Sequence, residues 1–140
     1  MATTAEVVAA LTGVLAEIPG LMVYDHVPDS VQVTGPVAVV IPRAAARVSV
    51  NSGMFNRQFE IVVAVQRSTD RPGQQKLFEF MDASGARSVH AQLHANQGLG
   101  LTGVSMAWNG DTGLDTVRDV PGVDWWGFTI DLTVTYTTGV

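Results

Sequence analysis

The sequence predicts an α+β domain. A mostly antiparallel sheet of four to five strands would carry an N-terminal helix and a central helix, continuous or broken, on one face, plus a β-hairpin arm. The first observation behind this prediction is the alternation of apolar with small or polar residues from Trp126 to Tyr136, typical of a long strand with one buried face. The others are an apolar stripe at helical spacing in residues 7–18 and a continuous apolar run at 37–41.

The composition limits the classes of protein to consider. The 140 residues suit a single domain, 1–140, with a sizeable core. The absence of cysteine excludes disulfides, thiolate metal sites and cysteine nucleophiles, and it fits a reducing compartment. A net charge of −5 argues against a nucleic-acid binder with a broad basic face. We see no apolar run long enough to span a bilayer and no secretory signal.

Charged residues are scarce in this chain. They make up 15% of it, against about 25% in an ordinary soluble domain. Because a monomer needs charged surface for solubility, we expect uncharged polar residues to cover much of the outside and other chains to cover part of it.

The first half of the chain should begin with a helix. Thr3-x-x-Glu6 is a capping-box pattern, and Pro19-Gly20 stops the apolar stripe that follows it. Residues 21–25 are a short strand candidate. The run 37–41 predicts an inner strand buried on both faces, and we expect Pro42 to end it because proline cannot donate to a strand ladder.

Residues 43–57 are expected to form a β-hairpin arm that reaches beyond the core sheet. The turn signal Asn51-Ser52-Gly53 lies near its middle, and alternating residues flank that signal. The arm leads into a firm strand at 58–66. Four apolar residues of that strand should face one way: Phe59, Ile61, Val63 and Val65.

The central helical region should follow a loop at 68–73. Its apolar face would be supplied by Leu77, Phe78, Phe80 and Met81. The periodicity breaks at 82–85, where Ser84 can cap a further helix that includes Val89 and Leu93 and ends at 96–98. Two helical pieces or one kinked helix both fit this pattern.

The last third of the chain should supply two more strands. Residues 101–108 form a strand candidate with Val104, Met106 and Trp108 in phase. An acidic loop at 111–124 separates it from the final long strand. The expected order of elements is therefore α-β-β-β-α-β-β.

Candidate catalytic and ligand-binding patterns are weak throughout. His90 and His94 have a spacing that can hold a divalent metal, but nothing nearby completes the site, so we favour two solvated helix histidines. The aspartates of the acidic loop lack calcium-loop spacing, and the Gly-x-Gly-x-x-Gly pattern at 98–103 enters a strand instead of a helix. No nucleophile elbow is present. We therefore expect no enzyme activity, cofactor or metal.

The Trp125-Trp126 pair offers one candidate contact. The alternation places Trp126 inward and Trp125 on the opposite face of the sheet. Exposed aromatic residues are enriched at protein–protein contacts, so Trp125 suits an interface. Burial of Trp125 under the acidic loop is an equally good interpretation.

Several segments together carry a family resemblance. They are Ile18-Pro19-Gly20-Leu21 after the first helix, Val23-Tyr24-Asp25 with Pro28-Asp29, the strand 38–42, the helical segment 84–89 and the terminal strand 126–134. In this order the chain resembles the tail terminator proteins of long-tailed bacteriophages, small neck proteins that cap the tail tube beneath the head. The resemblance covers nearly the full length and is one of pattern and length.

The resemblance implies a structural virion protein that forms a ring, typically of six copies. Such a ring stops tail-tube growth and joins the tail to the head. Its partners would be copies of itself, the tail tube protein and the head–tail connector or stopper, with DNA passing non-specifically through the lumen and no membrane involved. The protein would lie in the virion, at the neck of the tail, after assembly in the host cytoplasm.

Three alternatives stay open. Head–tail stoppers and tail completion proteins share this size and architecture, so the neck layer is not determined. A small ligand-binding or enzymatic α+β domain would need a concave pocket with converging polar groups. A soluble dimeric accessory protein is the third alternative.

The arm is the expected site of contact with partners, because it could reach a neighbouring subunit or tube ring by adding to a strand edge. Its arginines could pair with acidic residues next door. The residues expected at the partner interface are Arg43, Arg47, Met54, Phe55, Arg57 and Trp125.

Overall fold

The computed structural model describes residues 3–28, 36–45, 54–66, 70–117, 120 and 125–137. Within these ranges the chain is α+β, with three helices and a six-stranded mixed sheet. The elements in order are α1 (Thr4–Ala16), β1 (Met22–Tyr24), β2 (Val37–Ala45), β3 (Met54–Gln66), α2 (Asp70–Met81), α3 (Val89–Ala95), β4 (Val104–Asp111), β5 (Asp115–Thr116) and β6 (Trp125–Thr137). The predicted order of elements recurs here, with the central helix in two pieces and β5 in addition.

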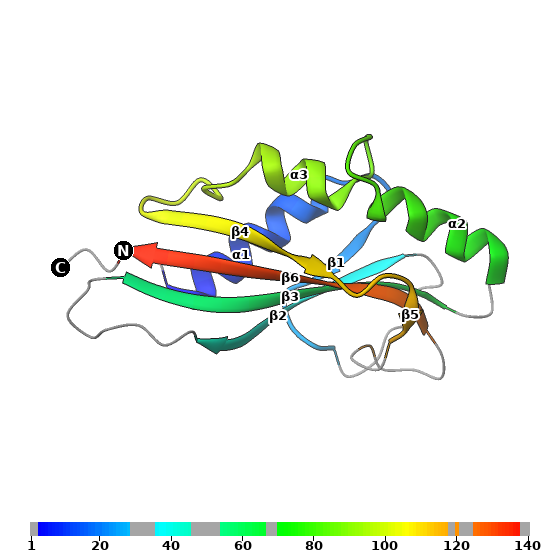
Figure 1. The fold of residues 1–140 in the computed structure, drawn as a ribbon, viewed down its shortest axis with the longest axis horizontal. Helices are drawn as coiled ribbons and strands as arrows, with labels where there is room; N and C mark the ends of the chain where they lie inside the picture. The colour runs from blue at the N-terminus through cyan, green and yellow to red at the C-terminus, as the bar shows by residue number, and fades with distance from the viewer. Residues whose placement is uncertain are drawn as a thin grey trace.

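The sheet is built around the pairing of its two longest strands. The strand order is β1-β2-β3-β6-β4, and the short β5 pairs with β6 beyond the end of β4 (Figure 1). β3 and β6 pair antiparallel along all 13 residues, from Met54↔Thr137 to Gln66↔Trp125. Only β1 pairs in parallel, with β2. The sheet is thus mixed, and the predicted mostly antiparallel sheet of four to five strands matches it in outline only.

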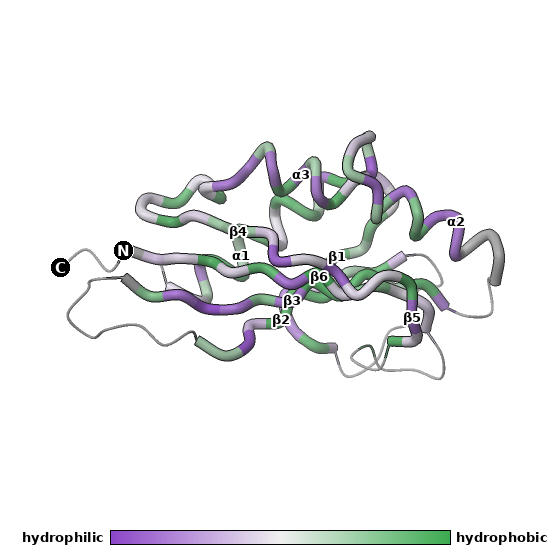
Figure 2. Tube along the Cα trace, in the orientation of Figure 1, coloured by the Kyte–Doolittle hydropathy of each residue, from purple (hydrophilic) through white to green (hydrophobic). Residues whose placement is uncertain are grey.

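The helices cover one face of the sheet. The larger core cluster contains buried residues of all three helices together with alternate residues of β3 and β6, among them Leu11, Leu77, Val89, Phe59, Ile61, Phe128 and Ile130. The intervening residues of these strands point to the other face, and Figure 2 shows hydrophobic and hydrophilic residues interspersed along β3 and β6. The alternation from Trp126 to Tyr136 therefore predicts the buried face of β6 correctly.

The helix-free face carries a second, smaller cluster at one end. It is formed by Val37, Val39, Ile41, Val62, Ala64, Val120 and Trp125. The inner strand predicted at 37–41 is thus buried on both faces, since Ala38 and Val40 belong to the larger cluster.

The prediction that Pro42 ends its strand is wrong. β2 continues to Ala45, and the ladder with β3 shifts register between Pro42 and Ala45. The reason lies in the neighbouring strands, because β1 pairs only with residues 37–39 of β2. Past that point the described sheet covers β2 on one side only, and a missing N–H on the open side interrupts no ladder.

Three predictions about the helices also need correction. α2 begins at Asp70 and includes Pro72, where we expected a loop. Proline is tolerated there because the first N–H groups of a helix have no partner within it. α3 is capped by Ser88 and not by Ser84, with Ser88 Oγ accepting a hydrogen bond from the N–H of Ala91 at 3.0 Å. Phe78, assigned to the apolar face, is 47% exposed.

The start of α1 agrees with its sequence signals. Thr3 is the N-cap, and its hydroxyl accepts a hydrogen bond from the N–H of Glu6 at 3.1 Å. The buried stripe comprises Val7, Leu11 and Leu15. None of the helices in the described part of the chain has the length and apolar character that crossing a bilayer requires.

Candidate interaction surface

The base of the predicted arm brings three of the expected interface residues together. Arg57 Nη1 donates a hydrogen bond to the carbonyl oxygen of Arg43 at 2.7 Å, and the Arg57 guanidinium carbon lies 5.2 Å from the centre of the Phe55 ring. Phe55 packs in turn against Tyr136, with ring centres 5.8 Å apart. These contacts lie within one chain, and they hold β3 against β2 and β6 at the base of the arm.

The Arg43 side chain lies over the helix-free face. Its Nη2 is 3.0 Å from Glu60 Oε2. Glu60 stands directly opposite Asp131 in the β3–β6 ladder, and like charges in that position repel. Arg43 therefore offsets part of a carboxylate repulsion inside its own chain.

The other expected interface residues are placed differently. Met54 is the first residue of β3, at the end of the described hairpin strand. Arg47 and the predicted turn at 51–53 lie outside the described residues. Trp125 is only 2% exposed and packs in the cluster that includes Val120, with Val117 against it. Burial under the segment before β6, the alternative we considered for Trp125, is what the structure shows.

The edge strand β4 is a further candidate contact feature that the expected interface residues did not include. β4 is the last strand in the order and pairs with β6 alone among the described strands. Its residues Ser105, Ala107, Asn109 and Asp111 are exposed. Alternation predicted the strand itself, but its place at the edge depends on the topology.

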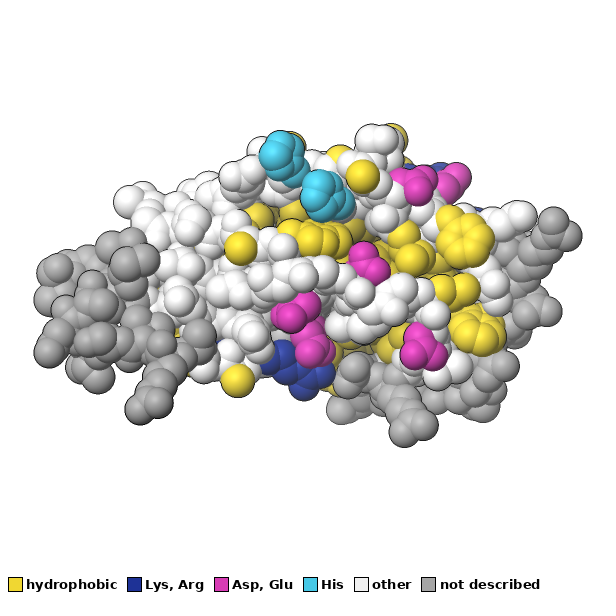
Figure 3. Space-filling view, in the orientation of Figure 1, with side chains coloured by type: hydrophobic (Ala, Val, Ile, Leu, Met, Phe, Trp, Pro, Cys, Tyr) yellow, Lys and Arg dark blue, Asp and Glu magenta, His cyan; other side chains and the backbone are white. Residues whose placement is uncertain are grey.

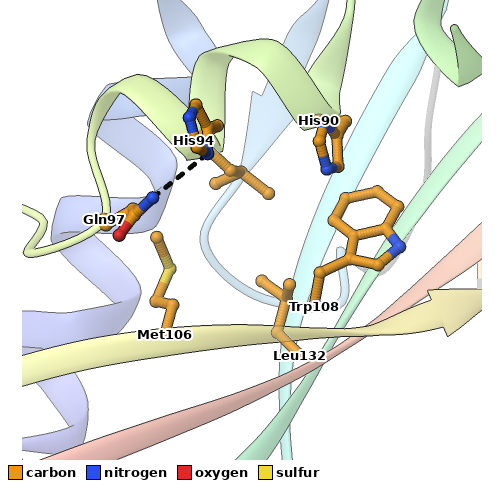
Figure 4. A pocket seen from close by; sticks show the side chains of 7 residues that line it. His90, His94, Gln97, Met106, Trp108 and Leu132 are labelled. Atoms are coloured by element: carbon orange, nitrogen blue, oxygen red, sulfur yellow. Dashed lines mark hydrogen bonds between the residues drawn. The ribbon is translucent and has the colours of Figure 1, made fainter. Parts of the chain in front are cut away.

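A groove runs beside this edge, between α3 and β4. It has a volume of about 130 Å³, and its lining consists of His90, Leu93, His94, Gln97, Met106, Trp108 and Leu132 (Figure 4). In Figure 3 hydrophobic side chains form a band between the helices α2 and α3 and the strand β4, with the histidines on the α3 side. Acidic side chains lie on both sides of the band, near α2 and beyond β4.

The two histidines of the groove differ in their surroundings. His90 packs edge-on against Trp108, with ring centres 4.9 Å apart, and its buried Nδ1 has no hydrogen-bond partner. His94 is exposed, and its Nδ1 lies 3.1 Å from Gln97 Nε2. The described residues contain no group of three His, Asp or Glu side chains placed to hold a metal ion. His94 fits the solvated interpretation, whereas His90 is half-buried and contributes to packing.

A second hollow lies between the end of α1 and β1. It has a volume of about 470 Å³ and is lined by residues 16–22 and Pro36. Its one ionisable side chain, Glu17, accepts a hydrogen bond from Gln92 Nε2 at 2.9 Å. This hollow therefore lacks the converging polar groups that a ligand site needs.

Comparison with known proteins adds no assignment. No protein-family model matches the chain, and no curated protein matches it significantly.

Proposed function

We propose that this protein is a tail terminator of a long-tailed bacteriophage. It would form a ring of six copies that caps the tail tube and joins it to the head–neck connector while leaving a passage for DNA. The observation that carries the proposal is a subunit whose sheet holds two dissimilar, separated features that neighbouring copies could contact. One is the braced base of the hairpin on β2 and β3, and the other is the open edge of β4 with its groove.

A closed ring requires contacts of this kind. In a ring each subunit uses one patch toward its left neighbour and a different patch toward its right neighbour. β3 and β6, paired over 13 residues, connect the two features through one continuous sheet. At about 3.3 Å per residue these strands are about 43 Å long, enough to cross a domain of this size.

The surface composition supports a subunit whose flanks are covered. Charged residues make up 15% of the chain, and among the residues that the structure describes the large apolar side chains of Met22, Val27 and Phe78 are about half exposed. Aromatic and methionine side chains are enriched at protein interfaces. The net charge of −5 suits a lumen through which DNA passes without binding, because DNA affinity depends on basic residues that neutralise phosphates.

The small ligand-binding alternative has less support. The groove at α3 is smaller than the roughly 300–1,000 Å³ of ordinary ligand pockets. The larger hollow at the end of α1 is lined mostly by backbone and apolar groups, with its single acid engaged by Gln92.

Electron microscopy of tail-tube growth tests the proposal. The tail-tube protein of the same genome is polymerised with and without this protein, and we expect tubes of limited length with a ring at one end. A ring that binds the portal complex instead of tube ends would favour a head–tail stopper. A protein that leaves tube length unchanged and binds neither end would contradict the neck function. Monomers in isolation would not, because a ring can assemble on the tube alone.

A further inference from the structure

We propose that the outer edge of β4 and the groove beside it bind residues 46–50 of a second copy of this chain, which add as an extended strand. This inference rests on the proposed ring and names the surface through which neighbouring copies meet.

The acceptor is the regular part of β4. Residues 104–108 pair in register with β6, and the register shifts only between Trp108 and Gly110. Natural edge strands are protected against added strands by charged residues, proline or bulges. Residues 104–108 (Val-Ser-Met-Ala-Trp) have no charge and no proline, so this stretch of edge is open to pairing.

The donor has the matching pattern. Residues 46–50 read Ala-Arg-Val-Ser-Val, five residues in which two valines alternate with polar side chains. In an extended strand Val48 and Val50 share one face, while Arg47 and Ser49 share the other. With the valines toward the helices, they would lie against Met106 and Trp108 in the unfilled groove, and Arg47 and Ser49 would lie on the helix-free face.

The charges of donor and acceptor are complementary. Residues 43–53 contain two bases, Arg43 and Arg47, and no acid, whereas residues 104–116 contain two acids, Asp111 and Asp115, and no base. Asp131, opposite Gly110, adds a third carboxylate beside β4. Complementary charges of this kind set the register and orientation of partners more than their affinity.

The occupant is a second copy because the topology separates each arm from its own β4. The arm connects β2 and β3, and β6 lies between β3 and β4. With neighbouring strands about 4.8 Å apart, β2 lies about 14 Å from β4, so an arm would have to fold back across two strands to reach its own edge. An arm from a neighbouring copy meets no such obstacle, and the head-to-tail contact that results can close a ring.

Disulfide trapping tests this contact directly, because the chain contains no cysteine. Ser49→Cys protein is mixed under oxidising conditions with Ser105→Cys or Ala107→Cys protein, with and without tail-tube ends. Ala16→Cys, exposed on α1, is the matched control acceptor. We expect about tenfold more disulfide-linked heterodimer with the β4 acceptors than with the control, since adjacent strands raise the effective concentration of the thiols.

A charge exchange provides the second measurement. Arg47→Asp in the donor, or Asp131→Arg in the acceptor, should each lower the yield about two- to fivefold, as expected for an ion pair near the surface, because Asp131, opposite Gly110, lies on the helix-free face proposed for Arg47. The two changes together should restore the yield.

Four outcomes would overturn the inference or separate it from the proposed function. Equal yields with Ala16→Cys and the β4 acceptors, with and without tubes, contradict the β4 contact. An internal disulfide in a Ser49→Cys/Ala107→Cys double variant, without linkage between single variants, assigns the edge to the protein's own arm. Tube capping without the cross-link would support the tail terminator function and contradict the β4 contact. The cross-link without tube capping would support the β4 contact and contradict the tail terminator function.

Discussion

Gly127 lies at a point where β6 is covered by both β3 and the segment leading out of β5. A Cβ atom at this position would meet the carbonyl oxygen of Val63 and lie 2.7 Å from Cγ2 of Val117. A glycine is therefore required here because Val63 and Val117 of the same chain approach the backbone too closely to leave room for a side chain. From the sequence it is one more small residue in an alternating pattern.

Replacing Gly127 by alanine should lower the free energy of unfolding by about 1–3 kcal/mol, the usual cost of overpacking. Urea unfolding measures it. The matched control is Gly13→Ala on α1, where a Cβ would meet nothing within 4 Å, and this change should stabilise the protein by about 0.5–1 kcal/mol. Equal effects at the two positions would mean that the packing around Gly127 is not tight.

Tyr136 should make stability depend on alkaline pH. Burial raises the pKa of its phenol above the ordinary value of 10.0, and the charge of Arg57 offsets only part of this rise. Above pH 10 the folded protein thus keeps a proton that the unfolded chain has lost, so the free energy of unfolding falls as pH rises from 10 through the raised pKa. Unfolding at pH 9 and pH 11 should show a larger fall for the wild type than for Tyr136→Phe. An identical fall in both would exclude Tyr136 as the cause.

At the scale of elements, the sequence predicted most helices and strands but misplaced some of their ends. Pro42 and Pro72 signalled ends, yet the first lies in a strand with an open side and the second in a first helical turn. In both places the neighbouring structure makes the missing N–H harmless. β5 was missed because two residues carry no periodicity.

The cap of α3 gives a prediction at this scale. Ser88→Ala should lower the free energy of unfolding by about 0.5–2 kcal/mol, because Ser88 Oγ caps the N–H of Ala91 and also donates to the carbonyl oxygen of Asp82. Ser84→Ala is the matched control and should change stability little, since Ser84 is exposed and does not cap the helix. Thermal unfolding of both variants compares the two positions. A larger loss at Ser84 would mean that the helix begins earlier.

At the scale of the whole molecule, the sheet separates two apolar clusters of unequal size. The larger cluster packs the three helices against the sheet, and the smaller cluster covers one end of the helix-free face. The rest of that face carries exposed or half-buried polar side chains, including Gln58, Thr133 and Thr135. In the proposed ring, this polar face is available for contacts with the tail tube or the connector, in addition to the hairpin base and the β4 edge through which neighbouring copies would meet.

Trp125→Ala should therefore destabilise the isolated subunit by about 3–5 kcal/mol, as expected for a large buried side chain. Denaturant unfolding of the subunit at low concentration measures this without any contribution from assembly. If the variant unfolds like the wild type but fails to assemble, Trp125 acts at the partner interface and not in the stability of the subunit.

By itself the sequence determined the α+β class, the order of the main elements and which face of each long strand is buried. These follow from local periodicity, because a period of two or 3.6 assigns a side chain to a face wherever the element later packs. Only the tertiary structure decided that β4 is an edge strand, that Trp125 is covered and that Arg57 braces its own hairpin. Each depends on which distant segments become neighbours, and no local pattern records the strand order of a sheet.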